Sequence, residues 1–407
     1  MKNTTLLLLS GATLLQAGTP DLATAPLVPA ASSWIVPFLD IRVRYEFADV
    51  DGYDVSHALT SRERVGLKTT EWNGFSALVE GEFSQAIIDD YNGGAPGADP
   101  FDPNNSLIAD PETNELNQGY LQYSGHHNLL RVGRQRLIYD SANYIGNVGW
   151  RQNEQTFDAL TLANKCVDSL TLNYAYVNQV NRIFGSAADG PATNASPNVQ
   201  DIGSNTHLFN ASYTGLEGVT LGGYVYLMDF DRVTGWDNDT YGASAKGDVG
   251  GFTLYGEVAY QEKAGPLNND QAWYAHGTIT KAFDQQSLTL GVEFLGSGFQ
   301  TPLATLHAFN GWADAFVGRR TAGTHGGITD GYLSYMLPVC WDMKWTNVLH
   351  AFGDNSLDAS LGWEYDTMLL KKFDEHFTGI LKVATFDSDD KRYQTTTRAS
   401  VELNYVF

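Results

Sequence analysis

The sequence has few cysteines, few charged residues and no long apolar run. Two of its 407 residues are cysteines and 18% are charged. No stretch approaches the roughly 20 consecutive apolar residues that a membrane helix requires. If the chain crosses a bilayer, it must do so with strands that close into a barrel. Basic residues are scarce too, and the formal net charge of −22 argues against nucleic acid as a partner.

Glycine (41 residues) and aromatic residues (12%) are plentiful. The acidic residues gather in segments that we interpret as solvated outer loops, and contact with divalent cations shared with lipopolysaccharide is the alternative. We predict no metal site and no cofactor. The acidic segments are 49–51, 89–90, 99–115, 229–239 and 387–390.

The chain begins with a segment typical of a secretory signal peptide. Lys2 precedes an apolar run at Leu6–Leu15, and small residues follow near two candidate cleavage points, Ala17 and Ala25. A buried N-terminal strand or helix is the alternative. The expected boundaries are 1–25 for the signal peptide, 26–37 for a periplasmic lead-in and 38–407 for the barrel.

Alternation of apolar and polar residues runs through the segments expected to form strands. In Ile41–Phe47 the odd positions are apolar or aromatic, whereas the even positions are Arg42, Arg44 and Glu46. This is the pattern of a strand with one apolar face, which a membrane barrel turns outward. The same pattern recurs in 62–68, 252–261, 288–294 and 361–366, where Leu361 shares the apolar face with Trp363 and Tyr365.

Connection lengths alternate between short and long, as periplasmic turns and outer loops do in bacterial barrels. Eight short turns and nine long loops join eighteen strands. The last segment alternates and stops at an aromatic residue, as terminal barrel strands do. Closure would pair it with the first strand and place Glu402 and Asn404 beside Arg42 and Arg44. We therefore predict an all-β fold, a transmembrane antiparallel β-barrel of about 18 strands, in the outer membrane of a Gram-negative bacterium.

Cys166 and Cys340 both fall in expected periplasmic turns, where an oxidising space favours disulfides. The two turns are eight strands apart in a ring of eighteen, which is roughly 35 Å across. A disulfide tolerates about 7 Å between Cα atoms. We therefore predict no disulfide between them.

Basic residues of the first two expected strands face away from their apolar neighbours. A charge that faces lipid at mid-bilayer costs about 2–4 kcal/mol, so we expect these side chains in the lumen. There they would concentrate anions, because guanidinium groups bind carboxylates in bidentate geometry. A bracing role, in which they pair with acids such as Glu46, Glu80 and Glu82, is the alternative. The five residues are Arg42, Arg44, Arg62, Arg64 and Lys68.

The expected strand around Gly133 does not resolve into two clean faces. Alternation points Arg131 and Gln135 toward the lumen but Arg134 and Arg136 outward. A bulge near Gly133, or emergence of the chain from the bilayer, would relieve this conflict.

Two segments carry sequence motifs more specific than the alternation common to all barrels. Residues 131–158 contain RVGRQRL and IGNVGWRQNEQTFD, and residues 306–330 contain LHAFNGWADAF and GITD. Both segments resemble the alginate-export family of outer-membrane barrels, and the strand rhythm is similar to that family from about residue 38 onward. The resemblance implies an eighteen-stranded porin-like channel whose arginine-rich lumen passes an anionic polysaccharide by diffusion. The candidate pore-lining residues in the first segment are Arg131, Arg134, Arg151 and Asp158.

The long connection at 297–327 is unusually aromatic and rich in amides for an exposed loop. We predict that it folds into the lumen as a constriction, with Trp312 as a sugar-stacking face. An outer loop packed on the barrel rim is the alternative. The polar partners of Trp312 would be Asn310, Asp314, Arg319 and Arg320.

The sequence favours a passive outer-membrane channel for an anionic poly- or oligosaccharide such as alginate, moving out or in. A general or uptake porin for small anionic solutes is the alternative. A barrel enzyme such as a lipase or esterase is less favoured, because the sequence has no Gly-x-Ser-x-Gly elbow, and we expect no enzyme. An adhesin has no specific support. Expected partners are outer-membrane lipid, lipopolysaccharide, the transported polysaccharide and periplasmic export proteins.

Overall fold

The structure is a computed structural model that describes residues 33–265, 267, 270–322, 326–356 and 359–407. The expected signal peptide and most of the lead-in lie outside these residues. None of the helices in the described residues has the length and apolar character needed to cross a membrane.

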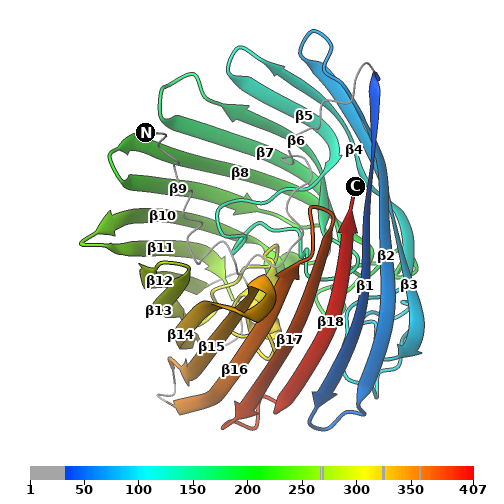
Figure 1. Ribbon diagram of the computed structural model, residues 1–407, viewed down its shortest axis with the longest axis vertical. Helices are drawn as coiled ribbons and strands as arrows, with labels where there is room; N and C mark the ends of the chain where they lie inside the picture. The colour runs from blue at the N-terminus through cyan, green and yellow to red at the C-terminus, as the bar shows by residue number, and fades with distance from the viewer. Residues whose placement is uncertain (1–32, 266, 268–269, 323–325, 357–358) are drawn as a thin grey trace.

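Eighteen antiparallel strands form one closed sheet, in which each strand pairs with its sequence neighbours and β1 also pairs with β18. Figure 1 shows the first and last strands side by side. This confirms the predicted fold and strand count. The strands are β1 (Ile35–Val50), β2 (Ser56–Thr69), β3 (Phe75–Asp90), β4 (Thr113–Gly125), β5 (Asn128–Gln135), β6 (Thr156–Asn164), β7 (Leu170–Asn181), β8 (Asp201–Leu216), β9 (Val219–Met228), β10 (Asn238–Val249), β11 (Phe252–Ala264), β12 (Asp270–Phe283), β13 (Gln286–Leu295), β14 (Ile328–Val339), β15 (Met343–Asp354), β16 (Ala359–Lys372), β17 (Phe377–Ser388) and β18 (Thr396–Val406).

Short and long connections alternate around most of the barrel, but the expected long connection between β1 and β2 (51–55) is as short as the turn between β2 and β3 (70–74). One boundary differs, because β1 begins at Ile35 and residues 35–37 of the expected lead-in belong to the first strand. Cys166 lies in the turn between β6 and β7, and Cys340 lies in the turn between β14 and β15. Both cysteines are free and exposed.

The outer face of the barrel is apolar. On β2, for example, Val65 and Leu67 are 51% and 46% exposed, whereas Arg62 and Arg64 point inward and are buried. A closed sheet with such a face can span a bilayer without leaving backbone groups unpaired. Other large apolar side chains exposed on this face are Val43, Val79, Phe83, Leu121, Leu160, Val258, Ile279, Leu290, Val292, Leu333, Leu349, Trp363, Leu381 and Leu403.

Leu361 departs from the predicted alternation. It is fully buried and packs with Trp312 and Phe316, although Trp363 faces outward as expected. The pairing of β15 with β16 shifts register between Phe352 and Gly353, which leaves Leu361 without a partner in β15 and turns it inward, while Ala359 and Ser360 before it stay exposed.

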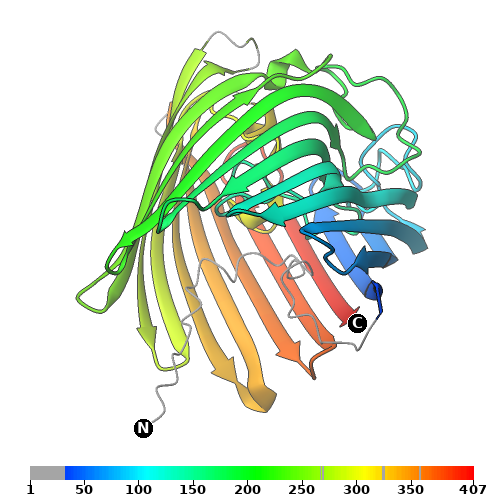
Figure 2. The same cartoon turned by 90° about the horizontal axis from the view of Figure 1, so that it is seen from above.

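The interior is filled by long connections that fold back into the barrel (Figure 2). Tyr144 and Ile145 of loop 136–155 pack with Leu303 of loop 296–327 and with Tyr224 and Tyr274 on the barrel wall. A second cluster joins loops 91–112, 136–155 and 182–200. The core of this protein therefore lies inside the lumen, between the loops and the wall.

Candidate functional site

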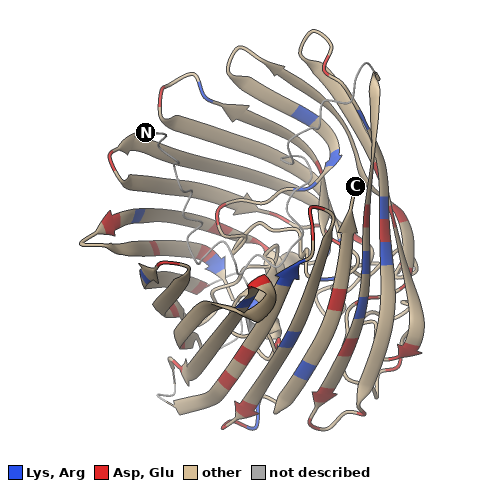
Figure 3. Cartoon of the chain, viewed as in Figure 1, with Lys and Arg blue, Asp and Glu red and all other residues tan. Residues whose placement is uncertain are grey.

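The predicted basic residues of the first two strands do face the lumen. Arg42 and Arg44 on β1 and Arg62 and Arg64 on β2 share the inward face, and Arg42 lies directly opposite Arg62. Figure 3, in which Lys and Arg are blue, shows blue bands on these two strands. We call Arg42, Arg44, Arg62 and Arg64 the arginine ladder.

The strand that closes the barrel contributes to the same surface. In the register of β1 with β18, Arg42 lies opposite Asn404 and Arg44 opposite Glu402, which confirms the predicted closure. Arg42 Nε donates to Asn404 Oδ1 at 3.1 Å and lies 3.5 Å from a Glu402 carboxylate oxygen.

Each arginine of the ladder pairs with an acid. Arg62 binds Asp40, Arg64 binds Glu82, and Arg44 binds Asp110 of loop 91–112. All four guanidinium groups are at most 1% exposed. These contacts match the bracing alternative, because charges buried this deeply need paired partners.

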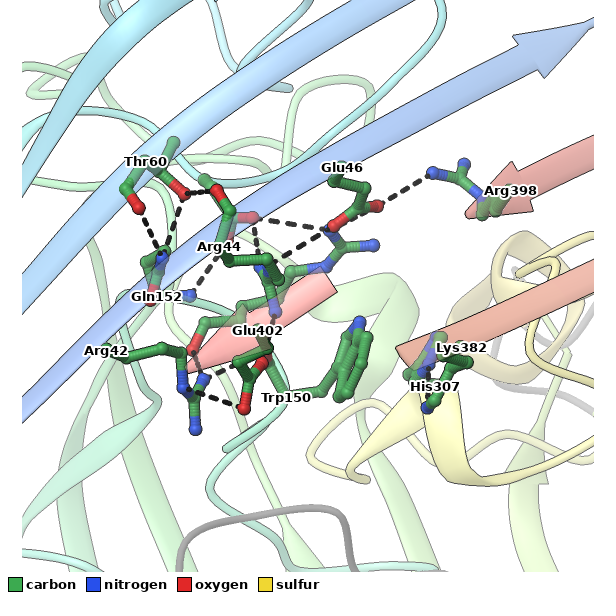
Figure 4. Close-up of polar contacts among 12 residues, drawn as sticks. Arg42, Arg44, Glu46, Thr60, Trp150, Gln152, His307, Lys382, Arg398 and Glu402 are labelled. Atoms are coloured by element: carbon green, nitrogen blue, oxygen red, sulfur yellow. Dashed lines mark hydrogen bonds and ion pairs between the residues drawn. The ribbon is translucent and has the colours of Figure 1, made fainter. Parts of the chain in front are cut away.

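Loop 136–155 covers the ladder from the lumen side (Figure 4). Arg42 Nη1 lies 3.1 Å from the carbonyl oxygens of Gly149, Trp150 and Arg151, and Arg44 donates to the Trp150 carbonyl. The alternation of β1 and β2 predicts which way the arginines point. It says nothing of a backbone segment that is distant in sequence and lies across them.

The ladder retains donors that no acceptor uses. Arg62 makes its one hydrogen bond through Nη2 to Asp40, and its Nε and Nη1 have no hydrogen-bond partner within the described residues. A guanidinium carries five N–H donors. Arg62 is therefore an electropositive point with free donors, next to Arg42 and Arg64.

Lys68 and Arg131 also face inward, and both are half-buried. Arg131 lies over the ring of Tyr120, with its guanidinium carbon 4.9 Å from the ring centre, and donates to Gln122 at 2.6 Å. In the described part of the chain neither cation has a carboxylate partner. They are thus the predicted lumen cations that stay both unpaired and partly accessible.

Arg134 and Asp158 form an ion pair on the outer face of the barrel, which corrects their prediction as pore-lining residues. Their neighbours Val132 and Leu160 are opposite each other and exposed, and the register continues without a shift to Arg134 opposite Asp158. Arg134 Nε lies 2.7 Å from Asp158 Oδ1.

Arg136, in contrast, turns inward. Strand β5 ends at Gln135, so the next residue leaves the sheet and pairs with Glu154. Gly133 has a φ of 124°, and a Cβ built there would lie 2.3 Å from the Gly119 carbonyl oxygen. The register of β5 with β4 and β6 is unbroken through Gly133, so no bulge lies there, and Arg136 turns inward because the chain leaves the sheet after Gln135.

Loop 296–327 folds into the lumen, as the sequence predicted, and does not pack on the rim. That it acts as a constriction stays a prediction. Asn310 donates to Glu293 of β13 at 2.6 Å, and the Trp312 N–H donates to Asp366 of β16 at 3.2 Å. The Ala313 N–H donates to Glu364 at 2.7 Å. All three acceptors face inward.

The remaining predicted residues of this loop have different surroundings. Arg320 is buried and lies 2.7 Å from Asn310 Oδ1. Trp312 is only 4% exposed, so its ring offers no open face for a sugar. Arg319 lies in the short helix α1 (Val317–Ala322), and its side chain is outside the described part of the structure.

Loops 136–155 and 296–327 meet in the lumen. Arg151 Nη2 lies 3.0 Å from Asp314 Oδ2, and the rings of Trp150 and His307 stack at 4.6 Å with an interplanar angle of 8°. Ile145 and Leu303 form a β-bridge between the same two loops. The two segments that carried the family resemblance are thus packed against each other.

His307 connects this junction to the barrel wall. Burial lowers the pKa of His307 to about 4, although Asp314 opposes the shift, so the ring is neutral at pH 7. Its Nδ1–H donates to Asp314 at 2.9 Å, and its Nε2 accepts from Lys382 of β17 at 3.0 Å. Burial raises the pKa of Asp314, but His307 and Arg151 outweigh this effect and hold it below its usual range.

The sequence prediction missed Lys382 and Arg398, which both face the lumen from the last two strands. A signal was present, since Ile380, Lys382 and Ala384 share one face of β17 by alternation. In the described ranges, no group of three or more His, Cys, Asp or Glu side chains is placed to hold a metal ion.

Comparison with known proteins adds structural likeness only. No family model matches the chain, and no curated protein matches it. OccAB3 of Acinetobacter baumannii superposes with a TM-score of 0.67 at 14% identity, over 92% of this chain and 99% of that one. OccAB4 of the same organism gives 0.68 at 12% identity, over 93% and 99%. The outer membrane protein OpdK of Pseudomonas aeruginosa gives 0.67 at 13% identity, over 91% and 98%.

These likenesses cover nearly the whole chain and show its fold. Together with the closed sheet of eighteen strands and its apolar outer face, they identify the protein as an outer-membrane β-barrel. They give no support to alginate export in particular.

Proposed function

We propose that this barrel is a passive channel for small anionic solutes, the general or uptake porin among the sequence-based alternatives. The observation that carries the proposal is the arginine ladder, four inward guanidinium groups on two adjacent strands, with free donors on Arg62. Lys68 and Arg131 extend the inward positive charge to accessible positions. Each ladder arginine has an acidic partner, so the accessible excess of positive charge comes from Lys68 and Arg131. Fixed cations in a low-dielectric lumen raise the local concentration of anions.

The backbone segment over the ladder supports binding of an anion at Arg42. Three backbone carbonyl oxygens of Gly149–Arg151 surround Arg42 Nη1. Carboxylate oxygens accept the same hydrogen bonds, and they do so more strongly because they are charged. A carboxylate solute that displaces this segment would therefore replace the lost contacts of Arg42.

The packing of the two loops favours small solutes over a polymer. Arg151 with Asp314, and Trp150 with His307, join the loops across the lumen. A polysaccharide chain needs a continuous open path through the lumen. Both contacts would therefore have to stay broken while the polymer passes. Diffusion of alginate remains the second candidate, favoured by the resemblance of the two segments that form these loops.

One structural neighbour supports the solute class. OpdK of P. aeruginosa, 13% identical with a TM-score of 0.65, has been solved with vanillate. Vanillate is a small aromatic carboxylate. The apolar outer face of this chain would lie against outer-membrane lipid and lipopolysaccharide.

Uptake into liposomes tests the proposal. Purified protein is reconstituted, and the permeation rates of glucuronate, glucose and glucosamine are compared, since the three sugars are similar in size and differ in charge. We expect glucuronate to enter fastest and glucosamine slowest. Equal rates, or fastest entry of glucosamine, would refute it. Alginate oligomers of increasing length provide the second arm: entry that does not fall with length would favour the polysaccharide channel.

A further inference from the structure

The side chain of Lys382 reaches from the barrel wall into a cage of aromatic rings. Its Nζ lies 3.5 Å from the centre of the Trp150 ring and 4.4 Å from that of Trp312. It also donates a hydrogen bond to His307 Nε2 at 3.0 Å. Figure 4 shows Lys382 beside His307 and Trp150. The lysine is 5% exposed, and its charge is stabilised by these three rings and by the carboxylates of Asp366, Glu402 and Asp314.

The three rings belong to the two loops that fill the lumen. Trp150 lies in loop 136–155, whereas His307 and Trp312 lie in loop 296–327. Lys382 is part of β17 and cannot move with either loop. It is therefore a fixed cation at the point where both loops meet the wall.

The chemistry of the cage suits a cation and little else. The face of an indole ring carries negative charge, and its attraction for an ammonium grows when water is excluded. The cavity lined by Lys382, the three rings, Glu46, Arg398 and Ser400 is about 10 Å³, which holds at most one water molecule. Neutral His307 supplies a lone pair on the remaining side.

Beyond the cage, the contacts continue between the loops. His307 donates to Asp314, and Asp314 accepts from Arg151 of the other loop. Arg151 in turn reaches Glu46 on β1 at 3.2 Å. One chain of contacts thus runs from β17, through both loops, to β1 on the far side of the closing seam.

We propose that Lys382 is the positioning residue of the constriction: its charge fastens loops 136–155 and 296–327 to β17 and holds them across the lumen. Without that charge, the Trp312 ring loses its contact with Lys382, and the Trp150 ring keeps the longer contact with Arg44, at 5.0 Å from its centre. Loop 296–327 then detaches from the wall more often, although its hydrogen bonds to Glu364 and Asp366 remain. The role of Lys382 in positioning the loops does not depend on which solutes the channel passes. Its consequence for conduction rests on the proposed channel function.

The test measures loop release without transport. Cys166 and Cys340 are replaced by serine, and buried Ala313 next to the cage is replaced by cysteine as a reporter. The rate of labelling by a water-soluble maleimide then reports how often the loop detaches. We expect Lys382→Met to label about 30-fold faster, equivalent to about 2 kcal/mol for the lost cation–π contacts. Lys382→Arg should label near the parent rate.

Chemical rescue separates charge from packing. In Lys382→Ala, n-butylammonium should slow labelling toward the parent rate, whereas n-butanol, which has a similar size and no charge, should not. Exposed Lys344 of β15 is the matched control, and Lys344→Met should leave labelling unchanged. Trp312→Leu removes one face of the cage from the loop side and should also speed labelling.

Parent-rate labelling in Lys382→Met, or in Trp312→Leu if the lysine variants do not fold, would overturn the proposal. So would equal rescue by the amine and the alcohol. Folding of each variant is checked by its heat-modifiable migration on a gel. The proposed function fails separately: a parent protein that shows no anion preference, with labelling still faster in Lys382→Met, would refute the channel selectivity and leave the role of Lys382 intact.

Discussion

Arg151 and Asp314 are 163 positions apart in the chain, and their side chains meet at 3.0 Å inside the barrel. Arg151 also lies 3.2 Å from Glu46 of β1 and 3.5 Å from Asp110 of loop 91–112. It therefore contacts two other loops and the barrel wall. The lumen is therefore organised by charge pairs between loops rather than by the strands alone.

This pair gives the first prediction. Removing one partner leaves the other charge buried and uncompensated, which costs on the order of 3 kcal/mol. Arg151→Gln should lower the free energy of unfolding more than Asp314→Asn, because Arg151 has additional carboxylate partners. The double variant should lose less than the sum of the two. Urea unfolding of the folded barrel measures all four proteins, and strict additivity would show that the contact carries no energy.

Arg62 gives a prediction about selectivity. It makes one hydrogen bond, to Asp40, and keeps free donors. Arg62→Gln removes a positive charge from the ladder and leaves the buried Asp40 carboxylate without its nearest cation, which should cost on the order of 3 kcal/mol of unfolding free energy. We expect the ratio of anion to cation permeability to fall roughly twofold. The control is Lys391→Gln, in an exposed outer loop. An equal fall in both variants would mean that total charge, and not the ladder, sets selectivity.

The junction at His307 should respond to pH. The closed loop holds the histidine at a pKa of about 4, whereas a released histidine titrates near 6.5, so the proton binds the released loop more tightly. Acidification from pH 7 to pH 5 therefore favours release, by roughly 20-fold in the equilibrium constant. The groups around the ring are Asp314, Arg151, Lys382 and Trp150. Single-channel records should show more frequent opening at pH 5.

The control for this effect is His307→Gln, which keeps hydrogen-bonding atoms and does not titrate. Its records should be alike at pH 7 and pH 5. If the parent protein also gates alike at both values, the lowered pKa of His307 has no part in holding the loop.

Two glycines of the barrel should tolerate alanine very differently. A Cβ at Gly133 would lie 2.3 Å from the Gly119 carbonyl oxygen, and the φ of 124° is strained for any other residue. A Cβ at Gly256 would have nothing within 4 Å. Gly133→Ala should lose on the order of 1–3 kcal/mol of unfolding free energy. Gly256→Ala should be neutral or slightly stabilising, and equal losses in the two variants would contradict this account.

Much of the barrel could be predicted because strand alternation is a local signal. The face that carries Arg42 and Arg62, the turn that carries Cys166, and the register of Glu402 against Arg44 all follow from period two and connection length. Leu361 shows the limit of that reasoning, since one register shift turns it to the other face, and the local mark of that shift is the neighbouring Gly362, with a φ of 134°.

The site was less predictable because it depends on loops that meet far from their strands. That Trp150 lies against His307, or that three carbonyls surround Arg42, follows from the path of loops with no periodic pattern. Loop composition correctly suggested that 297–327 enters the lumen. It could not show that the face of the Trp312 ring contacts Lys382, which lies on a strand 70 positions later in the chain.

The central claim is that fixed cations make this barrel an anion channel, and the most direct measurement is the reversal potential in a planar bilayer. With a KCl gradient across the membrane, the reversal potential of the parent protein should have the sign expected when chloride permeates faster than potassium. The reversal potential of the Arg62→Gln variant should have the same sign and a smaller magnitude. A reversal potential of the sign set by potassium in the parent protein would contradict the account.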